Sequence, residues 1–580
     1  MTIVLGLNAY EINSSAAIIK NGIVEFAMCE ERFTRKKRDK VFPFNSIQAG
    51  LKELNITFND IDAIAVGWNP IVEAQKSNGT LGIRPRELYF YKLVEEFLSR
   101  IEPDNLDLDW SLIRTSGKSI PDIYFVRHHI SHACNSIFQS PFNQGDFLSL
   151  DFQGEKESGS YGSFNNNQIE IKAISKQPRS TGAFYAAITQ MIGYTPDSDE
   201  WKVMALSAAK SDRNKVNQYI EVFKESVADG EISPLLKNEY YNTNSPWDKY
   251  LTTSKLRELL DYPNEIKDRN SLDIRNWQIN IATAMQLFIS KFTLDAIKDI
   301  SEKNNSKRDK LCLSGGFFMN CVFNSEIERS NIYKSIYISP SPADLGNSIG
   351  SAMYVYHSVL NNKRVNYKNH KLFSGISHEK ELIKKLDNYQ INYTKFDHLN
   401  DLVNNIVDEL LKEKVIGINY GKSEFGERAL GARSILALPK SKFMKDKINS
   451  KIKYREEYRP FAPVCPKESA HIYFEVAKDY ECRSMEKVAF VRSEWIHKLE
   501  AITHFDNSAR LQTVDKDENI LLNYIFKEME IRKEIPVLIN TSFNLNGEPN
   551  VENIDDALRT FYTSGLDTLV LDMVIIRKGY

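Results

Sequence analysis

The segment Ile123-Tyr124-Phe125-Val126-Arg127-His128-His129-Ile130-Ser131-His132 joins a short apolar stretch to three of the chain's ten histidines. The apolar residues predict a strand, and we expect a helix to begin at the histidines. His128 and His132 are then four residues apart and project from the same helical face. Two neutral imidazoles on one face form half of a divalent-metal site. Asp151 and Asp344 are the candidates for the oxygen ligands that would complete it.

Two interpretations of this histidine pair stay open. Histidines are often buried for structural reasons, as helix caps or hydrogen-bonded core residues. The alternative is a metal centre, and two imidazoles with two carboxylates favour iron, manganese or zinc over calcium. We therefore take His128, His132, Asp151 and Asp344 as the candidate catalytic and metal-binding residues.

Strand-like and helix-like segments alternate along the first 360 residues, which is typical of an α/β fold. Strands are predicted at residues 1–7 and 22–28 around a Ser14-Ser15 turn, and at 147–150, 310–313 and 335–339. A polar stretch at 361–371 predicts a linker between domains 1–360 and 361–580. The second domain is also predicted to be α/β, with strands at 415–420, 535–540 and 568–576 and helices at 442–452 and 553–564. Residues 237–270 have the composition of an insertion or lid, and no internal repeat is evident.

The composition is that of an ordinary soluble protein of 580 residues, with 42% hydrophobic and 26% charged residues and a formal net charge of −2. No apolar run reaches the roughly 18 residues needed to span a bilayer, so no membrane partner is expected. The N-terminus lacks the pattern of a signal peptide. The six cysteines are scattered without a Cys-x-x-Cys pair, which argues against a zinc ribbon or a disulfide framework. A cytoplasmic location is the simplest expectation.

Positive charge is concentrated in one region of this nearly neutral chain. Residues 421–460 contain eleven Lys and Arg against five Asp and Glu. A solvated basic face, a phosphate-rich ligand and nucleic acid are the three interpretations. Turn motifs interrupt the charges instead of leaving a continuous stripe, which favours a pocket for a small polyanion.

Two glycine turns in the first domain suggest a nucleotide loop. Ser314-Gly315-Gly316 follows a predicted strand, and a second turn spans residues 344–350. Backbone N–H groups at such turns can approach a phosphate or a ribose. We assign Ser314, Gly315, Gly316 and Gly346 to this loop. For Asp151 and Asp344, turn capping is the alternative role.

The C-terminal domain contains four arginine- or serine-centred motifs. Arginine forks and a lysine are the groups that recognise phosphates and carboxyl phosphates. Each arginine alone could be a surface salt bridge, but four separate turns make that interpretation poor for the set. The motifs are Gly426-Glu427-Arg428-Ala429-Leu430-Gly431-Ala432-Arg433-Ser434, Lys453-Tyr454-Arg455-Glu456-Glu457-Tyr458-Arg459-Pro460-Phe461-Ala462-Pro463, Ala509-Arg510-Leu511-Gln512-Thr513-Val514 and Asn540-Thr541-Ser542-Phe543-Asn544.

Together these residues resemble the NodU/CmcH family of carbamoyltransferases, which carbamoylate hydroxyl groups of antibiotics, nodulation factors and polysaccharides. The resemblance extends over nearly the whole chain. Besides the C-terminal motifs, it includes Gly6-Leu7-Asn8, residues 30–37, His128 to His132, Asp151, Glu200-Trp201-Lys202-Val203-Met204 and Ser314-Gly315-Gly316.

The resemblance implies an N-terminal actin/hexokinase-like (ASKHA) domain and a C-terminal YrdC-like domain. The YrdC-like domain would convert ATP and carbamoyl phosphate into carbamoyl adenylate, and the N-terminal domain would transfer the carbamoyl group to a hydroxyl of a sugar or natural product. The implied metal, held by the four candidate ligands above, is ferrous iron, and magnesium is a further candidate cation. The implied residues for carbamoyl phosphate and the adenylate are Arg428, Lys453, Arg459, Arg510, Ser542 and Asn544.

One departure from the family pattern concerns the base that activates the acceptor. Where the family usually has His-Asp, this chain has Ile12-Asn13. A histidine there would be a natural general base, and Ile12 cannot replace it. Glu11, His129 or metal activation are the substitutes, or else transfer is weaker or uses a different nucleophile.

Two other functions remain as alternatives. A threonylcarbamoyl-adenosine tRNA-modifying enzyme would share both domain types, but the sequence pI of about 6.6 and the lack of a basic stripe count against nucleic acid. Hydrogenase-maturation carbamoyltransferases carry paired-cysteine zinc fingers, which this chain lacks. A non-catalytic, nucleotide-gated binding protein on an actin-like fold would leave the C-terminal arginines without a use. The identity of the acceptor and the formation of a homo-oligomer stay open.

Overall fold

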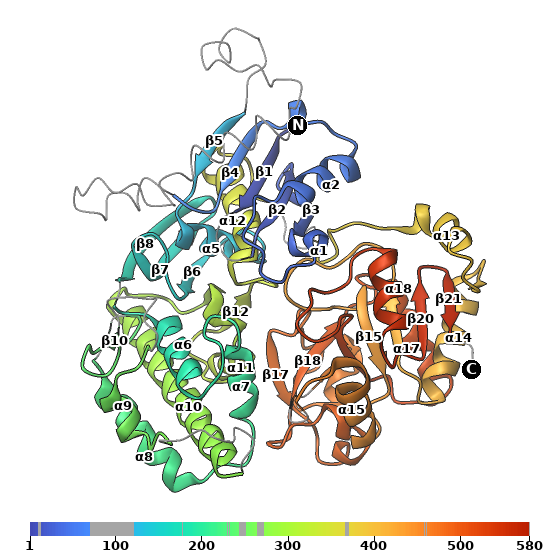
Figure 1. Cartoon of the computed structure of the whole chain (residues 1–580). Coiled ribbons are helices and arrows are strands. Elements are labelled where there is room, and N and C mark those ends of the chain that lie inside the picture. The colour runs from blue at the N-terminus through green and yellow to red at the C-terminus, as the bar shows by residue number, and fades with distance from the viewer. Residues whose placement is uncertain are drawn as a thin grey trace.

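A computed structural model describes residues 1–9, 13–69, 121–176, 178–228, 230, 232–242, 251–263, 272–365, 371–456, 459 and 461–578. The chain forms two N-terminal lobes and a C-terminal domain beside them (Figure 1). We call the body around the first sheet lobe I and the body around the second sheet lobe II.

The sheets of the two lobes have the same topology. In lobe I the strand order is β3-β2-β1-β4-β5, and in lobe II it is β8-β7-β6-β11-β12. In each sheet the first three strands pair antiparallel and the next two join in parallel. The strands are β1 (Ile3–Asn8), β2 (Ser15–Lys20), β3 (Ile23–Cys29), β4 (Ala63–Val66), β5 (Asp122–Phe125), β6 (Gln144–Leu150), β7 (Glu157–Asn165), β8 (Gln168–Lys176), β11 (Lys310–Ser314) and β12 (Ser335–Ile338). This duplication is the architecture of the actin/hexokinase-like fold, so the predicted fold class is confirmed.

Two helices pack between these sheets and fix how the lobes meet. Helix α12 (Asn347–Tyr354) lies on the sheet of lobe I, α5 (His128–Ile137) lies on that of lobe II, and the two helices contact each other. The helices approach closely at Gly350, where a Cβ atom would lie 1.8 Å from the Ser131 carbonyl oxygen. Both helices therefore have little freedom to shift, and α5 begins with the predicted histidines.

The remaining elements of the lobes surround these layers. Lobe I has α1 (Glu31–Thr34), α2 (Phe44–Leu54) and the 3-10 turn η1 (Phe58–Asp60), and α12 continues as the π-helix η6 (Val355–Val359). Lobe II has a core of aromatic and aliphatic side chains around the long helix α10. Its elements are α6 (Thr181–Met191), α7 (Glu200–Leu206), α8 (Arg213–Ser226), β9 (Val227–Ala228), β10 (Leu235–Leu236), α9 (Ser254–Leu259), α10 (Leu272–Lys303), η4 (Gly316–Met319), α11 (Cys321–Arg329) and η5 (Asp344–Gly346).

The C-terminal domain is an α/β body built on one nine-stranded sheet, and the predicted α/β class is confirmed. The strand order is β13-β21-β20-β14-β15-β19-β16-β18-β17. The strands are β13 (Thr394–Lys395), β14 (Ile416–Asn419), β15 (Arg433–Ala437), β16 (Ala462–Pro466), β17 (Lys487–Phe490), β18 (Ser508–Val514), β19 (Leu538–Ser542), β20 (Thr568–Leu571) and β21 (Val574–Arg577). The helices are α13 (Glu379–Asn388), α14 (Leu399–Leu411), α15 (Lys442–Ile448), η8 (Asn449–Lys453), η9 (Lys467–Ser469), α16 (Ala470–Tyr473), η10 (Ile496–Lys498), η11 (Glu500–Ile502), α17 (Ile520–Ile531) and α18 (Ile554–Tyr562).

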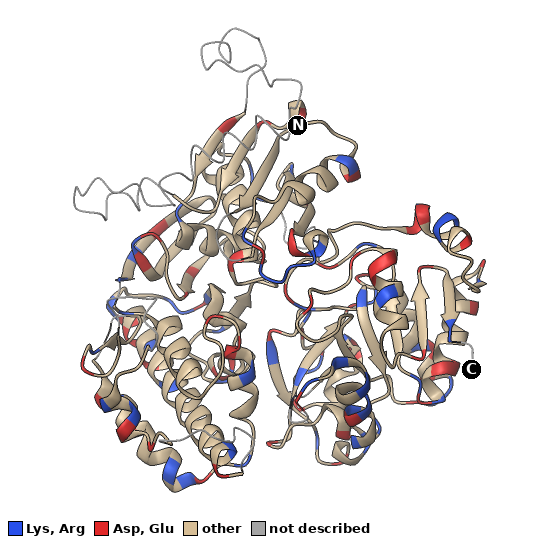
Figure 2. Cartoon of the chain, viewed as in Figure 1, with Lys and Arg blue, Asp and Glu red and all other residues tan. Residues whose placement is uncertain are grey.

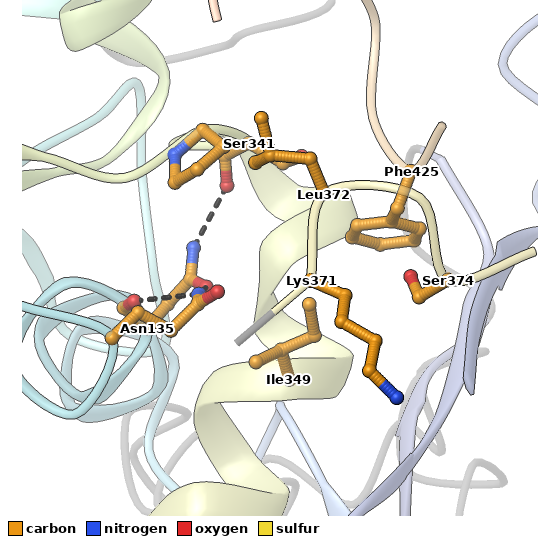
Figure 3. A pocket seen from close by; sticks show the side chains of 9 residues that line it. Asn135, Ser341, Ile349, Lys371, Leu372, Ser374 and Phe425 are labelled. Carbon is orange, nitrogen blue, oxygen red and sulfur yellow. Dashed lines mark hydrogen bonds between the residues drawn. The ribbon is translucent and has the colours of Figure 1, made fainter. Parts of the chain in front are cut away.

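The C-terminal domain contacts both lobes. On lobe II, the Ser325 hydroxyl donates to the Val488 carbonyl at 3.0 Å and accepts from the Val488 amide at 2.7 Å. On lobe I, the Arg32 guanidinium donates to the Val551 carbonyl at 2.9 Å. The segment after residue 371 closes a small pocket against α5 and α12 (Figure 3), where Asn135 donates to the Ser341 carbonyl at 2.8 Å.

Three local predictions were wrong. Residues 15–20 form the strand β2, where only a turn was predicted, because the run Ser-Ala-Ala-Ile-Ile-Lys pairs on both edges and is almost wholly buried. The single strand predicted at 568–576 is a hairpin, in which Asp572 takes the left-handed φ of 43° that a tight turn requires. In the segment predicted to be an insertion or lid, Tyr240, Tyr241, Leu256 and Leu260 are buried in the core of lobe II, which argues against a lid, while 243–250 and 264–270 lie outside the described residues.

The expectations about cysteines and membrane segments can be compared with the structure directly. All six cysteines lie in the described part of the chain, and each is free and buried. The prediction that they form no disulfide framework is therefore confirmed. None of the helices in the described ranges has the length and apolar character needed to cross a lipid bilayer.

Candidate metal centre and phosphate-binding cluster

The helix that presents the histidines begins where it was predicted to begin. Helix α5 starts at His128, and its first N–H, which has no acceptor within the helix, is satisfied by a carboxylate from lobe II. The His128 amide donates to the two Glu155 carboxylate oxygens at 2.9 and 3.1 Å. A carboxylate at a helix N-terminus accepts hydrogen bonds from free amide N–H groups and interacts favourably with the helix dipole. Glu155 therefore fixes the start of the helix and the direction of the histidines.

Four predicted ligands converge in front of α5. The Nε2 atoms of His128 and His132 lie 3.0 Å apart. Asp151 Oδ2 is 2.8 Å from His132 Nε2 and 3.5 Å from His128 Nε2. Asp344 Oδ1 is 3.3 Å from His132 Nε2 and 3.6 Å from His128 Nε2. One ligand atom from each of the four residues lies within 4.8 Å of all the others.

This donor set fits a divalent cation. Asp151 Oδ2 is buried and accepts no well-aligned hydrogen bond, although His132 Nε2 is close. Its lone pair therefore remains available for a cation among the four side chains. Two imidazole nitrogens and two carboxylates are the ligands that iron, manganese and zinc prefer. The histidines are buried, whereas the Asp151 and Asp344 side chains are 15% and 22% exposed, so the carboxylate side is the open one.

The carboxylates also control the protonation of the pair. Burial lowers the pKa of His128, but Asp151 and Asp344 outweigh burial and raise it to about 9. Burial raises the pKa of Asp151, yet His128 and His132 hold it well below its usual range. Without a cation, the centre is thus an ionised carboxylate paired with a proton on imidazole.

The third histidine of the segment has a structural role. His129 Nδ1 lies 2.8 Å from the Ser149 hydroxyl, and its Nε2 lies 3.0 Å from the Glu157 carbonyl. The side chain is fully buried, and burial followed by the charge of His128 and His132 lowers its pKa well below the usual value. Both ring nitrogens are engaged, so His129 does not replace the missing family histidine as a base. Residues 10–12, which include Glu11 and Ile12, lie outside the described residues.

Asp151 and the predicted nucleotide loop follow the carboxyl ends of two neighbouring strands and lie next to each other. Asp151 follows β6, and Ser314-Gly315-Gly316 ends the adjacent parallel strand β11. Gly315 has φ of 102°, and a Cβ atom there would lie 2.2 Å from the Leu150 carbonyl oxygen. A Cβ atom on Gly316 would lie 2.9 Å from Asp151 Oδ1. The glycine turn therefore packs directly against a candidate metal ligand.

Two other members of the predicted loop are engaged in packing. The buried Ser314 hydroxyl donates to the Pro342 carbonyl at 3.2 Å. Gly346 is buried, and a Cβ atom there would lie 2.1 Å from the Asn135 amide nitrogen. These packing contacts account for the residue type at both positions without a bound ligand. A contact of either residue with a nucleotide stays a prediction.

Three of the predicted phosphate-binding residues form one cluster in the C-terminal domain. The Lys453 ammonium, at the end of η8, donates to Asn544 Oδ1 at 2.7 Å, to the Asn544 carbonyl at 3.1 Å and to the Ser542 hydroxyl at 3.2 Å. Lys453 is 3% exposed. Burial, followed by repulsion from Arg455, Arg459 and Lys37, lowers its pKa well below the usual value. Neutral acceptors thus surround the Lys453 ammonium, and no carboxylate of the described residues forms an ion pair with it. We call Lys453, Ser542 and Asn544 the lysine cluster.

The three predicted arginines contact other parts of the molecule. Arg428 donates to the Met319 carbonyl at 3.1 Å, next to the glycine turn of lobe II. Arg459 stacks on the Trp201 ring at 3.9 Å from its centroid. Arg510 donates to the Met485 carbonyl at 2.9 Å and keeps Nη2 buried without a hydrogen-bond partner among the described atoms. None of these bonds joins an arginine to the lysine cluster itself.

Comparison with known proteins decides the family. Residues 3–353 match the carbamoyltransferase N-terminus family, and residues 407–578 match the carbamoyltransferase C-terminus family. The chain belongs to the carbamoyltransferase family. The family and the enzyme class predicted from the sequence, a carbamoyl-transferring enzyme, are both confirmed.

Relatives of this carbamoyltransferase align with all or part of its length. The uncharacterized protein sll1178 of Synechocystis sp. is 32% identical over 609 residues, which cover 100% of this chain and 97% of the relative. Nodulation protein NolNO of Sinorhizobium fredii is 29% identical over 585 residues, covering 98% and 80% of the two chains. The 3'-hydroxymethylcephem-O-carbamoyltransferase of Amycolatopsis lactamdurans is 27% identical over 294 residues, covering 51% and 53%.

Some residues around the carbamoyltransferase centre were missed in the sequence. Asn347 Nδ2 lies 3.3 Å from His128 Nδ1, and Trp68 contacts the His128 ring edge-to-face at a centroid distance of 5.3 Å. Glu155 caps the histidine helix. Asn347 has a signal, because it comes three residues after Asp344 in the same turn. Glu155 has a similar signal, because it comes four residues after Asp151 in the loop that follows β6, whereas Trp68 has none, since it follows β4 of lobe I.

Proposed function

We propose that this carbamoyltransferase makes carbamoyl adenylate from ATP and carbamoyl phosphate, and then carbamoylates a hydroxyl of a sugar or natural product. One observation carries the proposal: the chain holds two sites of opposite character, a His₂Asp₂ donor set and a buried lysine cluster. An acidic centre suits a cation, and a cationic cluster suits phosphates. A relative named as an O-carbamoyltransferase supports the hydroxyl acceptor.

The first half-reaction is assigned to the C-terminal domain, residues 361–580. Water cleaves carbamoyl phosphate to carbamate and inorganic phosphate. A carbamate oxygen then attacks the α-phosphorus of ATP, and pyrophosphate leaves. Lys453 supplies a positive charge, and Ser542 and Asn544 orient its ammonium. Arg428, Arg459 and Arg510 bind the remaining phosphate oxygens.

The second half-reaction is assigned to the N-terminal domain, residues 1–360. The acceptor oxygen attacks the carbamoyl carbon, AMP leaves, and the hydroxyl proton passes to a base. His128, His132, Asp151 and Asp344 would hold the metal, which supplies Lewis acidity and lowers the pKa of an acceptor oxygen. The resemblance implies ferrous iron at this centre, and magnesium is the natural partner of the ATP phosphates. In this proposal the backbone N–H groups of the turn at Ser314, Gly315 and Gly316 contact the adenylate.

Neither alternative function gains support from a specific observation. A tRNA-modifying enzyme needs a basic surface for nucleic acid, whereas Figure 2 shows Lys and Arg interspersed with Asp and Glu over the chain. A non-catalytic binding protein is set aside because the chain is a carbamoyltransferase.

The proposal is tested by pyrophosphate release from ATP, measured with the full-length enzyme with and without carbamoyl phosphate. We expect release to depend on carbamoyl phosphate, and AMP release to rise when hydroxyl acceptors are added. Pyrophosphate release that is indifferent to carbamoyl phosphate would rule out the proposed first half-reaction.

A further inference from the structure

One aromatic side chain of lobe II lies against the C-terminal domain. Trp201 is the second residue of helix α7, and 37% of its surface is exposed. Val203 and Leu206 of the same helix are buried in the core of lobe II, so α7 is fixed to that lobe. Figure 1 shows α7 on the side of lobe II that faces the C-terminal domain. The core of lobe II does not include the Trp201 ring, and the proposed function gives it no role.

The Trp201 ring stacks on a guanidinium of the C-terminal domain. The guanidinium carbon of Arg459 lies 3.9 Å from the ring centroid, which is a close cation–π contact. The indole is itself held in place, because its Nε1 donates to the Ser198 carbonyl at 3.0 Å. A stacked guanidinium turns one face to the ring and keeps its N–H donors along its edge. The ring therefore sets the plane in which Arg459 can donate hydrogen bonds.

The loop that carries Arg459 begins at the lysine cluster. Asn449 is the first residue of the π-helix η8, and Lys453 is the last. The Asn449 side-chain amide donates to the Arg459 carbonyl at 3.3 Å, and the Arg459 amide donates to the Glu456 carbonyl at 3.2 Å. The backbone at Arg459 thus returns to the helix that presents the Lys453 ammonium. These bonds fix the backbone of Arg459, but they do not set the direction of its side chain.

An ion pair is the second support of this side chain. Glu456 Oε2 accepts from Arg459 Nη1 at 3.3 Å, but the Glu456 side chain is 36% exposed, and the Lys202 ammonium lies 4.0 Å from its other oxygen. Such a pair is weak, because water and the second cation compete for the carboxylate. The Arg459 side chain is only 11% exposed, and shielding from water strengthens its cation–π contact. The Trp201 indole is therefore the stronger constraint on the direction of the guanidinium.

We propose that Trp201 is a positioning residue, which acts through Arg459 and orients its guanidinium toward a phosphate group of the substrates. The inference rests on the proposed function, in which Arg459 binds phosphate oxygens. It goes beyond that function, because a side chain of lobe II then determines how the C-terminal domain binds its substrate. A guanidinium binds phosphate through paired N–H donors, so a rotated plane loses one of the two bonds. Trp201 itself contacts neither substrate in this proposal.

The test is a double-mutant cycle in the full-length enzyme, with Trp201→Leu, Arg459→Gln and the double variant. Pyrophosphate release is measured while ATP and carbamoyl phosphate are varied separately. We expect Trp201→Leu to raise KM for one substrate about tenfold, with kcat within about threefold of wild type. In the Arg459→Gln background, the same change should alter KM by less than about twofold. An unchanged KM in Trp201→Leu, or an equal effect in both backgrounds, would overturn the inference.

Two further variants separate positioning from loss of structure. Trp201→Phe keeps an aromatic face beneath Arg459 and should raise KM by about threefold or less. Tyr524→Leu removes a ring of α17 that is 38% exposed and has Lys527 at 5.7 Å from its centroid, and it should match wild type in KM. Equal losses in Trp201→Phe and Trp201→Leu would contradict the inference, because the ring face would then be irrelevant. If Trp201→Leu does not fold, Trp201→Phe in the two Arg459 backgrounds completes the cycle.

Pyrophosphate binding separates failure of this inference from failure of the proposed function. If wild type releases no pyrophosphate in response to carbamoyl phosphate, the proposed function fails, and the four proteins of the cycle are compared by calorimetry with pyrophosphate. Binding that Trp201→Leu weakens only when Arg459 is present supports the positioning role. Equal pyrophosphate affinity of wild type and Trp201→Leu overturns it.

Discussion

The candidate metal centre and the lysine cluster have opposite electrostatic character. At the metal centre, two carboxylates converge on two imidazoles and keep a proton there when no cation is bound. At the lysine cluster, neutral oxygens surround one ammonium, and burial followed by neighbouring cations lowers its pKa. The first site is prepared for a positive ligand and the second for a negative one.

This difference indicates which half-reaction each of the two sites would support. A site that stabilises phosphate charge favours departure of pyrophosphate, whereas a Lewis-acid site favours attack on a carbonyl. If the division is correct, damage to one site should leave the function of the other intact. The predictions below test this independence, beginning with the largest expected effect.

Removing the ammonium of the lysine cluster should have the largest effect. Lys453→Ala should lower carbamoyl-phosphate-dependent pyrophosphate release by about 10³-fold or more, because it deletes the buried charge that we propose to face the phosphates. The metal content of the purified variant, measured by elemental analysis, should match that of wild type. Loss of both properties would mean that the two sites are not independent.

Removing one imidazole of the metal centre should give the complementary result. We expect His132→Ala to lose about 10²-fold in metal affinity while its pyrophosphate release stays within about threefold of wild type. Ser136→Ala, one turn further along the same helix, serves as the control for general damage to α5. If His132→Ala retains its metal, the assigned ligand set is wrong.

A glycine beside each site provides a smaller test. In Gly315→Ala, the added Cβ would meet the Leu150 carbonyl oxygen, and φ of 102° adds strain. We expect a loss of about 1–3 kcal/mol in the free energy of unfolding, together with weaker metal binding. Gly547→Ala, near the lysine cluster, has φ of 81° but nothing within 4 Å of the added atom. Denaturant titration should show the smaller loss for Gly547→Ala, and the reverse order would refute the packing argument.

Proton linkage should have opposite signs at the two sites. His128, with a pKa of about 9, is mostly protonated at pH 8 and must lose its proton to bind a metal. Metal binding should therefore release protons, about one per site, and strengthen as pH rises toward 9.

The pKa of Lys453 is well below its usual value, and a bound phosphate favours the ammonium form. Pyrophosphate binding should thus take up protons and weaken as pH rises. Calorimetry in buffers of different ionisation enthalpy measures both signs, and equal signs would contradict the comparison.

The sequence was most informative where a site depends on local spacing. The four-residue interval between His128 and His132 specifies one helical face wherever the helix lies. Lys453, Ser542 and Asn544 were grouped by the family resemblance, and the structure joins these three directly. The three arginines of the same prediction reach other partners, since a guanidinium has several donors and can be satisfied in many places.

Features that depend on distant parts of the chain were not predictable in this way. The two lobes repeat one strand order, but no sequence repeat accompanies it, because a fold constrains the pattern of burial more than residue identity. Strand β2 was not predicted, because its burial on both faces removes the alternation of polar and apolar residues that indicates a strand. Trp68 reaches the candidate metal centre through a tertiary contact with His128, and its own segment carries no signal of this role.

The central claim is most directly tested by quenching a reaction of His132→Ala with ATP and carbamoyl phosphate and measuring bound carbamoyl adenylate. Lys453→Ala is treated in the same way, and no acceptor is needed. The account predicts that carbamoyl adenylate accumulates on His132→Ala and is undetectable with Lys453→Ala. Its absence from His132→Ala, or its formation by Lys453→Ala, would contradict the division of the reaction between the two sites.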